Sequence, residues 1–240
     1  LEFDGENDYV EVPDDSSLDI TDAITISAWI YLPNVVGDKD ILQKADDVYE
    51  PYRFYTHNDR LIFQLSQNST VREFACTSYG VLSTGWQHIA VTYDKTEVKF
   101  YVNSVEKPNV GDTPTYSLRT TIGDLYIGIR KAGWSNPFNG TIDDVRIYNR
   151  SLNAEEIAKL YNHTYYNETG LVLHLKFDEG SGNTAYDSSD QENNGTVNGA
   201  TWVFEDRRFN NSIFSTPPSG YTLFCNEVNT ALEFDGVDDY

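Results

Sequence analysis

The chain has 240 residues, of which 39% are hydrophobic and 14% aromatic, and its formal net charge is −21 at pH 7. This length and composition suffice for a large folded domain and exclude an intrinsically disordered chain. The negative charge argues against nucleic acid as a partner, because the phosphates would be repelled. No hydrophobic run approaches 18 residues and no segment resembles a signal peptide, so we expect no membrane insertion within this window.

The opening segment, Leu1–Tyr9, recurs almost unchanged at the other end of the chain as Leu232–Tyr240, with seven of nine positions identical. A repeat separated by 231 residues predicts one period of a longer tandem array, with the window beginning and ending inside a domain. The alternative is that two unrelated strands share a turn motif.

Short segments of alternating hydrophobic and polar residues follow. In the first of them, Ile24, Ile26, Ala28 and Ile30 recur at every second position, which is typical of a strand. Turns around 57–60 and 94–96 predict hairpins. The strands predicted after the opening segment are 23–32, 40–45, 52–56, 61–66, 71–76, 86–93, 97–103, 125–130 and 141–148.

One helix is predicted, near residues 153–161. Asn153 can cap its first turn, Glu156 lies three residues further on, and Ile157 and Leu160 lie on one face. Strands of this length and spacing with one short helix predict an all-β fold, an antiparallel sandwich or jelly roll, and not a βαβ sheet.

Four segments together resemble a known family: Leu1–Val10, Ala23–Ile30, Gly85–Asp94 and Phe138–Ile157. They are similar to a LamG-like jelly roll of the concanavalin A-like lectin/glucanase superfamily, to which laminin G domains and pentraxins belong. Residues 170–240 resemble the start of the same domain, through residues 170–189 and the later Asn-Asn-Gly-Thr-Val at 193–197. In the family this segment precedes the Phe-Asp-Gly strand.

The resemblance implies a domain that is split across the repeat boundary. Residues 1–161 would be the C-terminal two-thirds of one jelly roll, 162–169 a linker, and 170–240 the N-terminal third of the next. Two copies of the opening strand would compete for one position if the chain closed on itself. We therefore expect residues 170–240 to complete the next unit, in a strand-exchanged or covalently continuous array.

Family members bind glycans or protein partners, often with calcium, and many are adhesion or spacer modules. The resemblance therefore implies a structural or adhesive module of a tandem-repeat cell-surface or filament-forming protein, whose partners are neighbouring copies of the same repeat. The alternative is a carbohydrate-binding adhesin module of the lectin type, with glycans as partners. Enzymatic relatives place carboxylates at alternate strand positions, as Glu2, Asp4 and Glu6 superficially do. Val237 replaces the third carboxylate in the second copy, so we expect no enzyme.

Calcium is the cofactor that the acidic loops could bind, since hard cations prefer six to eight oxygen ligands. The alternative is that these oxygens form Asx turns and solvated loops. The basic stretch Gly128–Gly133 matches the pentraxin calcium loop and does not suit that role. The four histidines, His57, His88, His163 and His174, lack metal-ligand spacing and are expected to be structural or on the surface. The candidate calcium ligands are Asp4, Asp8, Asp143, Asp144, Asp187, Asp190 and Asn193.

Loop aromatics could stack on sugar rings, and the candidates are Trp134, Tyr49 and Tyr52. Trp29 and Trp86 lie in predicted strands, where we expect burial.

Seven Asn-x-Ser/Thr motifs favour an extracellular or cell-surface location, where such acceptors can be glycosylated. Cys76 and Cys225 are the only cysteines, and a disulfide between them, or from one of them to a neighbouring unit, is expected in that compartment. The candidate glycosylation sites are Asn68, Asn139, Asn149, Asn162, Asn167, Asn194 and Asn210.

Overall fold

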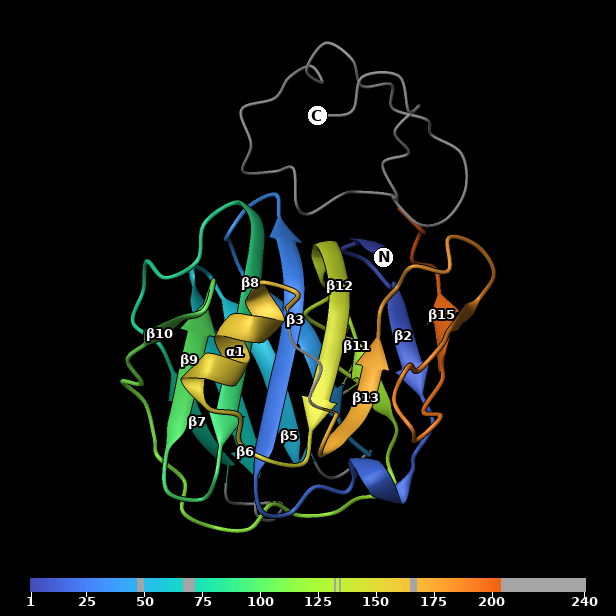
Figure 1. Cartoon of the computed structure of the whole chain (residues 1–240). Helices are drawn as coiled ribbons and strands as arrows, with labels where there is room; N and C mark the ends of the chain where they lie inside the picture. The colour runs from blue at the N-terminus through green and yellow to red at the C-terminus, as the bar shows by residue number, and fades with distance from the viewer. Residues whose placement is uncertain (47–49, 67–71, 132, 134, 165–167, 204–240) are drawn as a thin grey trace, which may run out of the picture. The chain divides into compact units, whose positions relative to one another are not determined.

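The computed structural model describes residues 1–46, 50–66, 72–131, 133, 135–164 and 168–203. These residues form two antiparallel sheets that lie face to face, with one helix on the outer face of the front sheet (Figure 1). Alternate strand residues meet between the sheets in one buried hydrophobic cluster, because neighbouring side chains of a strand point to opposite faces. The predicted all-β antiparallel sandwich is therefore confirmed.

The first sheet has seven strands, and its middle strand β3 is hydrogen-bonded on both sides. Its order is β1 (Glu2–Asp4), β12 (Asn139–Tyr148), β3 (Ile24–Leu32), β8 (Gly85–Tyr93), β9 (Val98–Val102) and β10 (Val105–Lys107), and β13 (Leu171–Leu175) also pairs with β12.

The second sheet has eight strands and supplies the face on which the candidate site lies. Its order is β14 (Thr184–Ala185), β15 (Gly195–Asn198), β2 (Tyr9–Val12), β11 (Leu125–Ile127), β4 (Asp38–Lys44), β5 (Tyr52–His57), β6 (Arg60–Ser66) and β7 (Arg72–Cys76). A 3-10 turn, η1 (Ser16–Leu18), follows β2.

Helix α1 (Ala154–Tyr161) packs on the outer face of the seven-stranded sheet (Figure 1). Ile157 and Leu160 are buried there in one cluster with Ala90 and Tyr101. The Asn153 side chain accepts a hydrogen bond from the Glu156 N–H, and the Glu156 carboxylate accepts one from the Asn153 N–H. This capping box confirms the predicted helix. Within the described residues, no helix has the length and hydrophobicity that crossing a bilayer requires.

The opening segment differs from the prediction of one strand, because a turn divides it into β1 and β2. Gly5 has φ +83°, which glycine adopts without strain. The buried Asp8 carboxylate accepts a hydrogen bond from the Asp4 N–H at 2.9 Å. The two halves then enter different sheets: β1 pairs with β12 and β2 pairs with β11 and β15.

Residues 170–203 also differ from the prediction that assigned them to a following domain. Here β13 pairs with β12, and β15 pairs with β2. Leu173 and Val197 join the same core as the strands of residues 1–161. In the described structure the segment therefore packs within the sandwich of its own chain, and whether it does the same beside a neighbouring unit stays a prediction. The remainder of the predicted unit, residues 204–240, lies outside the described residues.

A buried polar network joins β13 to β12. The Asp144 carboxylate, 4% exposed, accepts a hydrogen bond from Arg146 Nη1 at 2.8 Å and lies 2.8 Å from His174 Nε2. Nδ1 of His163, which follows α1, lies 3.8 Å from the same carboxylate. The Asp144 carboxylate thus contacts side chains on β12, on β13 and just after α1.

This network predicts a dependence of stability on pH. Burial lowers the pKa of His174 below its usual value, and Arg146 and Lys176 act in the same direction, whereas Asp144 raises it. Native His174 stays neutral at pH values where an unfolded histidine, with a pKa of about 6.5, takes up a proton. We expect the free energy of unfolding to fall as the pH decreases below about 6.5, because the unfolded state then binds more protons.

Urea unfolding at pH 7, 6 and 5 measures this effect. The His174→Gln variant should lose less stability over that range than the unsubstituted chain. His163→Gln tests the second histidine that faces Asp144. An identical pH dependence for His174→Gln and the unsubstituted chain would contradict the assignment to His174.

Candidate ligand-binding site

Four polar or aromatic side chains gather at one end of the eight-stranded sheet. Asp38 begins β4, His57 ends β5, Arg60 begins β6, and Tyr79 lies just beyond β7. Asp38 pairs in register with His57, and His57 with Arg60. His57 and Arg60 lie on the outer face of the sheet. Phe54 in β5 and Leu61 in β6 point into the core, and each is an odd number of positions from its rim residue, so the two side chains point to opposite faces. We call Asp38, His57, Arg60 and Tyr79 the rim cluster.

The members of the rim cluster contact one another closely. His57 Nδ1 lies 2.5 Å from Asp38 Oδ1, and each of these two side chains is 37% exposed. The Arg60 guanidinium lies over the Tyr79 ring, 4.5 Å from its centroid, and the His57 ring centroid is 6.4 Å from that of Tyr79. Tyr79 itself is 59% exposed. The cluster thus combines an accessible aromatic surface with hydrogen-bonding groups of both charges.

A buried ion-pair network supports the sheet beside the rim cluster. Arg53 donates two hydrogen bonds to the Asp40 carboxylate, at 2.5 and 2.6 Å, and its guanidinium lies 3.8 Å from the Tyr55 ring centroid. Glu50 accepts hydrogen bonds from Gln64 and Arg130. Burial raises the pKa of Asp40 to about 6, and Arg53 opposes that shift. The bidentate pair joins β4 to β5, the strands that carry Asp38 and His57.

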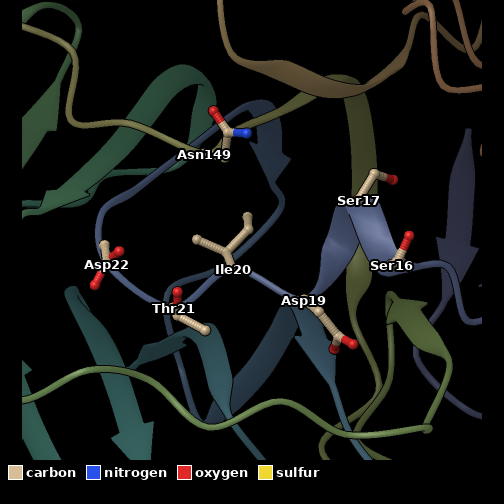
Figure 2. A pocket seen from close by; sticks show the side chains of 7 residues that line it. All are labelled: Ser16, Ser17, Asp19, Ile20, Thr21, Asp22 and Asn149. Carbon is tan, nitrogen blue, oxygen red and sulfur yellow. The ribbon is translucent and has the colours of Figure 1, made fainter.

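A cavity of ≈ 250 Å³ lies elsewhere, among the residues that follow β2 (Figure 2). Its carboxylates do not converge: Asp19 and Asp22 lie on opposite sides of Ile20 (Figure 2). Asp22 accepts a hydrogen bond from Lys95, and Asp19 accepts one from the Thr121 N–H. These contacts tie loops together, so we assign the cavity a structural role.

The predicted sugar-stacking aromatics are placed differently from the expectation. Tyr52 is 1% exposed, and its hydroxyl donates to the Leu18 carbonyl oxygen at 3.1 Å, so it cannot stack on a ligand and that prediction is wrong. Trp134 and Tyr49 lie outside the described residues. Trp29 is buried as predicted, at 8% exposure, whereas Trp86 is only half-buried and packs edge-to-face on Tyr31.

The predicted calcium ligands occupy three places in the fold. Asp4 and Asp8 form the turn between β1 and β2, and Asp143 and Asp144 lie on β12. In the loop between β14 and β15, the Asp187 carboxylate accepts hydrogen bonds from the backbone N–H groups of His174, Ser189 and Asn193 and from the Ser189 hydroxyl.

The other two predicted ligands in that loop differ in exposure. Asp190 is exposed, whereas Asn193 is buried and donates to Val172 and Ser17. In the described part of the chain, no three His, Cys, Asp or Glu side chains are grouped to hold a metal ion. Calcium binding stays a prediction, and the contacts of Asp187 match the alternative of Asx-type turns.

The modification sites that can be placed are accessible. Asn139, Asn149, Asn162 and Asn194 are all exposed. Asn68, Asn167 and Asn210 lie outside the described residues, as does Cys225. Cys76 is half-buried on β7 and forms no disulfide with a described residue, so the predicted disulfide, which needs Cys225 or a neighbouring unit, stays a prediction.

Sequence reasoning missed the rim cluster. The sequence predicts a hairpin turn at His57–Arg60 and a structural or surface role for His57, and it gives no ligand-binding role to Tyr79. The available signal was an aromatic residue followed by glycine in a connecting loop, with charged residues at both ends of a short hairpin. Only the pairing of β4, β5, β6 and β7 brings these residues together.

Comparison with known families agrees with the fold. Residues 4–158, more than half of the chain, match the model of the concanavalin A-like lectin/glucanases superfamily. The chain belongs to this superfamily. No curated protein was found to match it.

Solved structures with the same fold include binding proteins. A Bacteroides ovatus protein to which carbohydrate binding is attributed has a TM-score of 0.64 and 21% identity, over 83% of this chain and 59% of its own. A botulinum neurotoxin type C structure, whose cell entry depends on two ganglioside molecules, has a TM-score of 0.52 and 16% identity, over 66% of this chain and 40% of its own.

The heptameric SAP-like pentraxin of Limulus polyphemus has a TM-score of 0.52 and 12% identity, over 67% of this chain and 80% of its own. At these identities the likeness shows the fold. The match spans less than two thirds of the length of the first two proteins.

Proposed function

We propose that this chain is a saccharide-binding module and that the saccharide binds against the rim cluster. The observation that carries the proposal is the exposed Tyr79 ring beside the polar side chains of Arg60, His57 and Asp38. Membership of a superfamily named for its lectins and glucanases, and similarity to a structure with attributed carbohydrate binding, support the same class of ligand.

The chemistry of the rim cluster suits a sugar. An aromatic face offers an apolar surface to the C–H groups of a pyranose ring, and the Tyr79 hydroxyl keeps a polar tip in water. Asp38 can accept hydrogen bonds from sugar hydroxyls, while Arg60 donates them. The buried pair of Asp40 and Arg53 keeps this end of the sheet rigid, which reduces the entropy cost of binding.

Replacing Tyr79 with alanine should weaken saccharide binding by at least about tenfold, or ~1.4 kcal/mol, because the stacking surface is lost. A glycan array identifies a bound saccharide, and isothermal titration calorimetry then compares the variants. Tyr186→Ala is the matched control, since Tyr186 is 60% exposed and lies between β14 and β15. Equal affinity of the two variants would refute the rim cluster as the site, and an array without any bound saccharide would refute the function.

A second candidate function is that of a spacer in a tandem or filament-forming array. The repetition of Leu1–Tyr9 as Leu232–Tyr240 favours it, because the first copy forms β1 and the turn into β2 and seven of its nine residues recur in the second copy. The second copy lies outside the described residues. Phe3 is buried, and Phe234 is its counterpart in the repeat.

If the second copy inserts into a neighbouring chain, the native mass should rise with concentration, and Phe234→Asp should abolish the increase. Light scattering after size-exclusion chromatography measures this, and a constant monomer mass would count against strand exchange. Both proposals place the protein outside the cell, and the exposed glycosylation motifs support that location.

A further inference from the structure

Arg60 differs from four other described arginines, which lie in ion pairs. Arg53, Arg130, Arg146 and Arg150 pair with Asp40, Glu50, Asp144 and Glu156, at 2.5 to 2.8 Å. Among the described residues, the Arg60 guanidinium instead contacts the Tyr79 ring and, at 3.9 Å, the Cys76 sulfur. Its Nε is buried and has no hydrogen-bond partner there.

The absence of a carboxylate partner is unexpected in this chain. With 38 Asp and Glu against 17 Lys and Arg, acidic partners are in excess. A guanidinium has five N–H donors, and among the described residues those of Arg60 find only the Cys76 sulfur as an acceptor. Such an arrangement is maintained more readily where a ligand supplies the acceptors. The ligand groups that match the guanidinium are planar or tetrahedral anions, which accept two parallel hydrogen bonds.

Two acidic residues, Asp38 and Asp59, lie near Arg60 in the sheet and the hairpin, and neither forms an ion pair with it among the described residues. Asp38 Oδ1 lies 2.5 Å from His57 Nδ1, so Asp38 already has a hydrogen-bonding partner other than Arg60. Asp59 precedes Arg60 in the hairpin turn, and no ion pair joins the two in the described structure. The Tyr79 ring holds the guanidinium from one side through a cation–π contact, which orients its edge without using its N–H donors.

We infer that the rim cluster selects an anionic saccharide, with the carboxylate or sulfate group of the sugar bound by Arg60 and a ring of the sugar against Tyr79. This inference rests on the proposed saccharide-binding function and specifies its ligand class. Arg60 fixes the charge requirement, and Tyr79 provides affinity that does not depend on charge.

Matched ligands separate the two contributions. Oligogalacturonates carry carboxylates, and their methyl esters present the same sugar without the charge. Dextran sulfate and dextran form the corresponding pair for sulfate. We expect the unsubstituted chain to bind at least one charged member at least tenfold more tightly than its neutral counterpart. Arg60→Gln should remove this preference, whereas Tyr79→Ala should weaken both members of the pair.

Lys159→Gln, on helix α1 of the other sheet, removes one positive charge far from the rim cluster and should leave the preference unchanged. The thermal unfolding of each variant shows that it is folded. Equal binding of charged and neutral members, or equal weakening of both by Arg60→Gln, would overturn the anion inference while the saccharide function stands. If none of the four ligands binds and no saccharide on the glycan array binds, both the anion inference and the saccharide-binding function are overturned. The pair in which the charged member binds more tightly than the neutral one identifies whether Arg60 recognises a carboxylate or a sulfate.

Discussion

Replacing Asp144 with alanine is expected to lower the free energy of unfolding by about 3–5 kcal/mol, the range observed when one partner of a buried ion pair is removed. The Arg146 side chain is 7% exposed and would keep its charge without the carboxylate that now lies 2.8 Å away. His174 would lose the acceptor that attaches β13 to β12. Urea unfolding at pH 7 measures the loss.

Two further variants separate charge from shape. Asp144 has φ +53°, a conformation that asparagine tolerates better than alanine, so Asp144→Asn removes the charge with less backbone strain. It should lose less stability than Asp144→Ala. The exposed Asp190→Ala should change stability by less than about 0.5 kcal/mol. A loss below about 1 kcal/mol for Asp144→Ala would show that the network contributes little.

Truncating Phe63 to alanine should cost about 3–5 kcal/mol, because it removes a fully buried aromatic ring and leaves a cavity between the sheets. Phe63 packs edge-to-face on Phe54, with centroids 6.3 Å apart. Phe74 on the adjacent strand points to the opposite face and is 41% exposed, so Phe74→Ala is the matched control. Guanidinium unfolding should show a clear difference between the two. Equal losses would contradict the assigned faces of β6 and β7.

The hydrophobic alternation allowed the strands and the fold to be predicted, because burial of one face imposes a period of two along each strand. The same rule could have corrected the prediction for Tyr52. It lies two positions before Phe54 and is in phase with it, whereas Arg53 and Tyr55 point outward. Tyr52 therefore belongs to the inward-facing positions of β5 and not to a loop.

The candidate site could not be obtained from alternation alone, since it depends on pairing between strands. An irregularity between Asp40 and Leu42 shifts the register of β4 against β5, and Asp38 then pairs with His57. Tyr79 reaches the cluster only because β7 lies at the edge beside β6. The placement of residues 170–203 was missed for a related reason: strand propensity does not specify which copy of a repeated domain provides the open edge.

The pairing of β15 with β2 has a consequence for synthesis of the protein. Tyr9–Val12 leave the ribosome well before one of their partner strands, which begins at Gly195. At about 5–20 residues per second, the nascent chain needs on the order of ten to forty seconds to supply that strand. During this interval one edge of β2 is exposed to other nascent chains, so closely spaced ribosomes on one messenger would bring such edges together. Chaperone occupancy of the early strands would therefore affect the yield of folded protein more than the stability of the finished sandwich does.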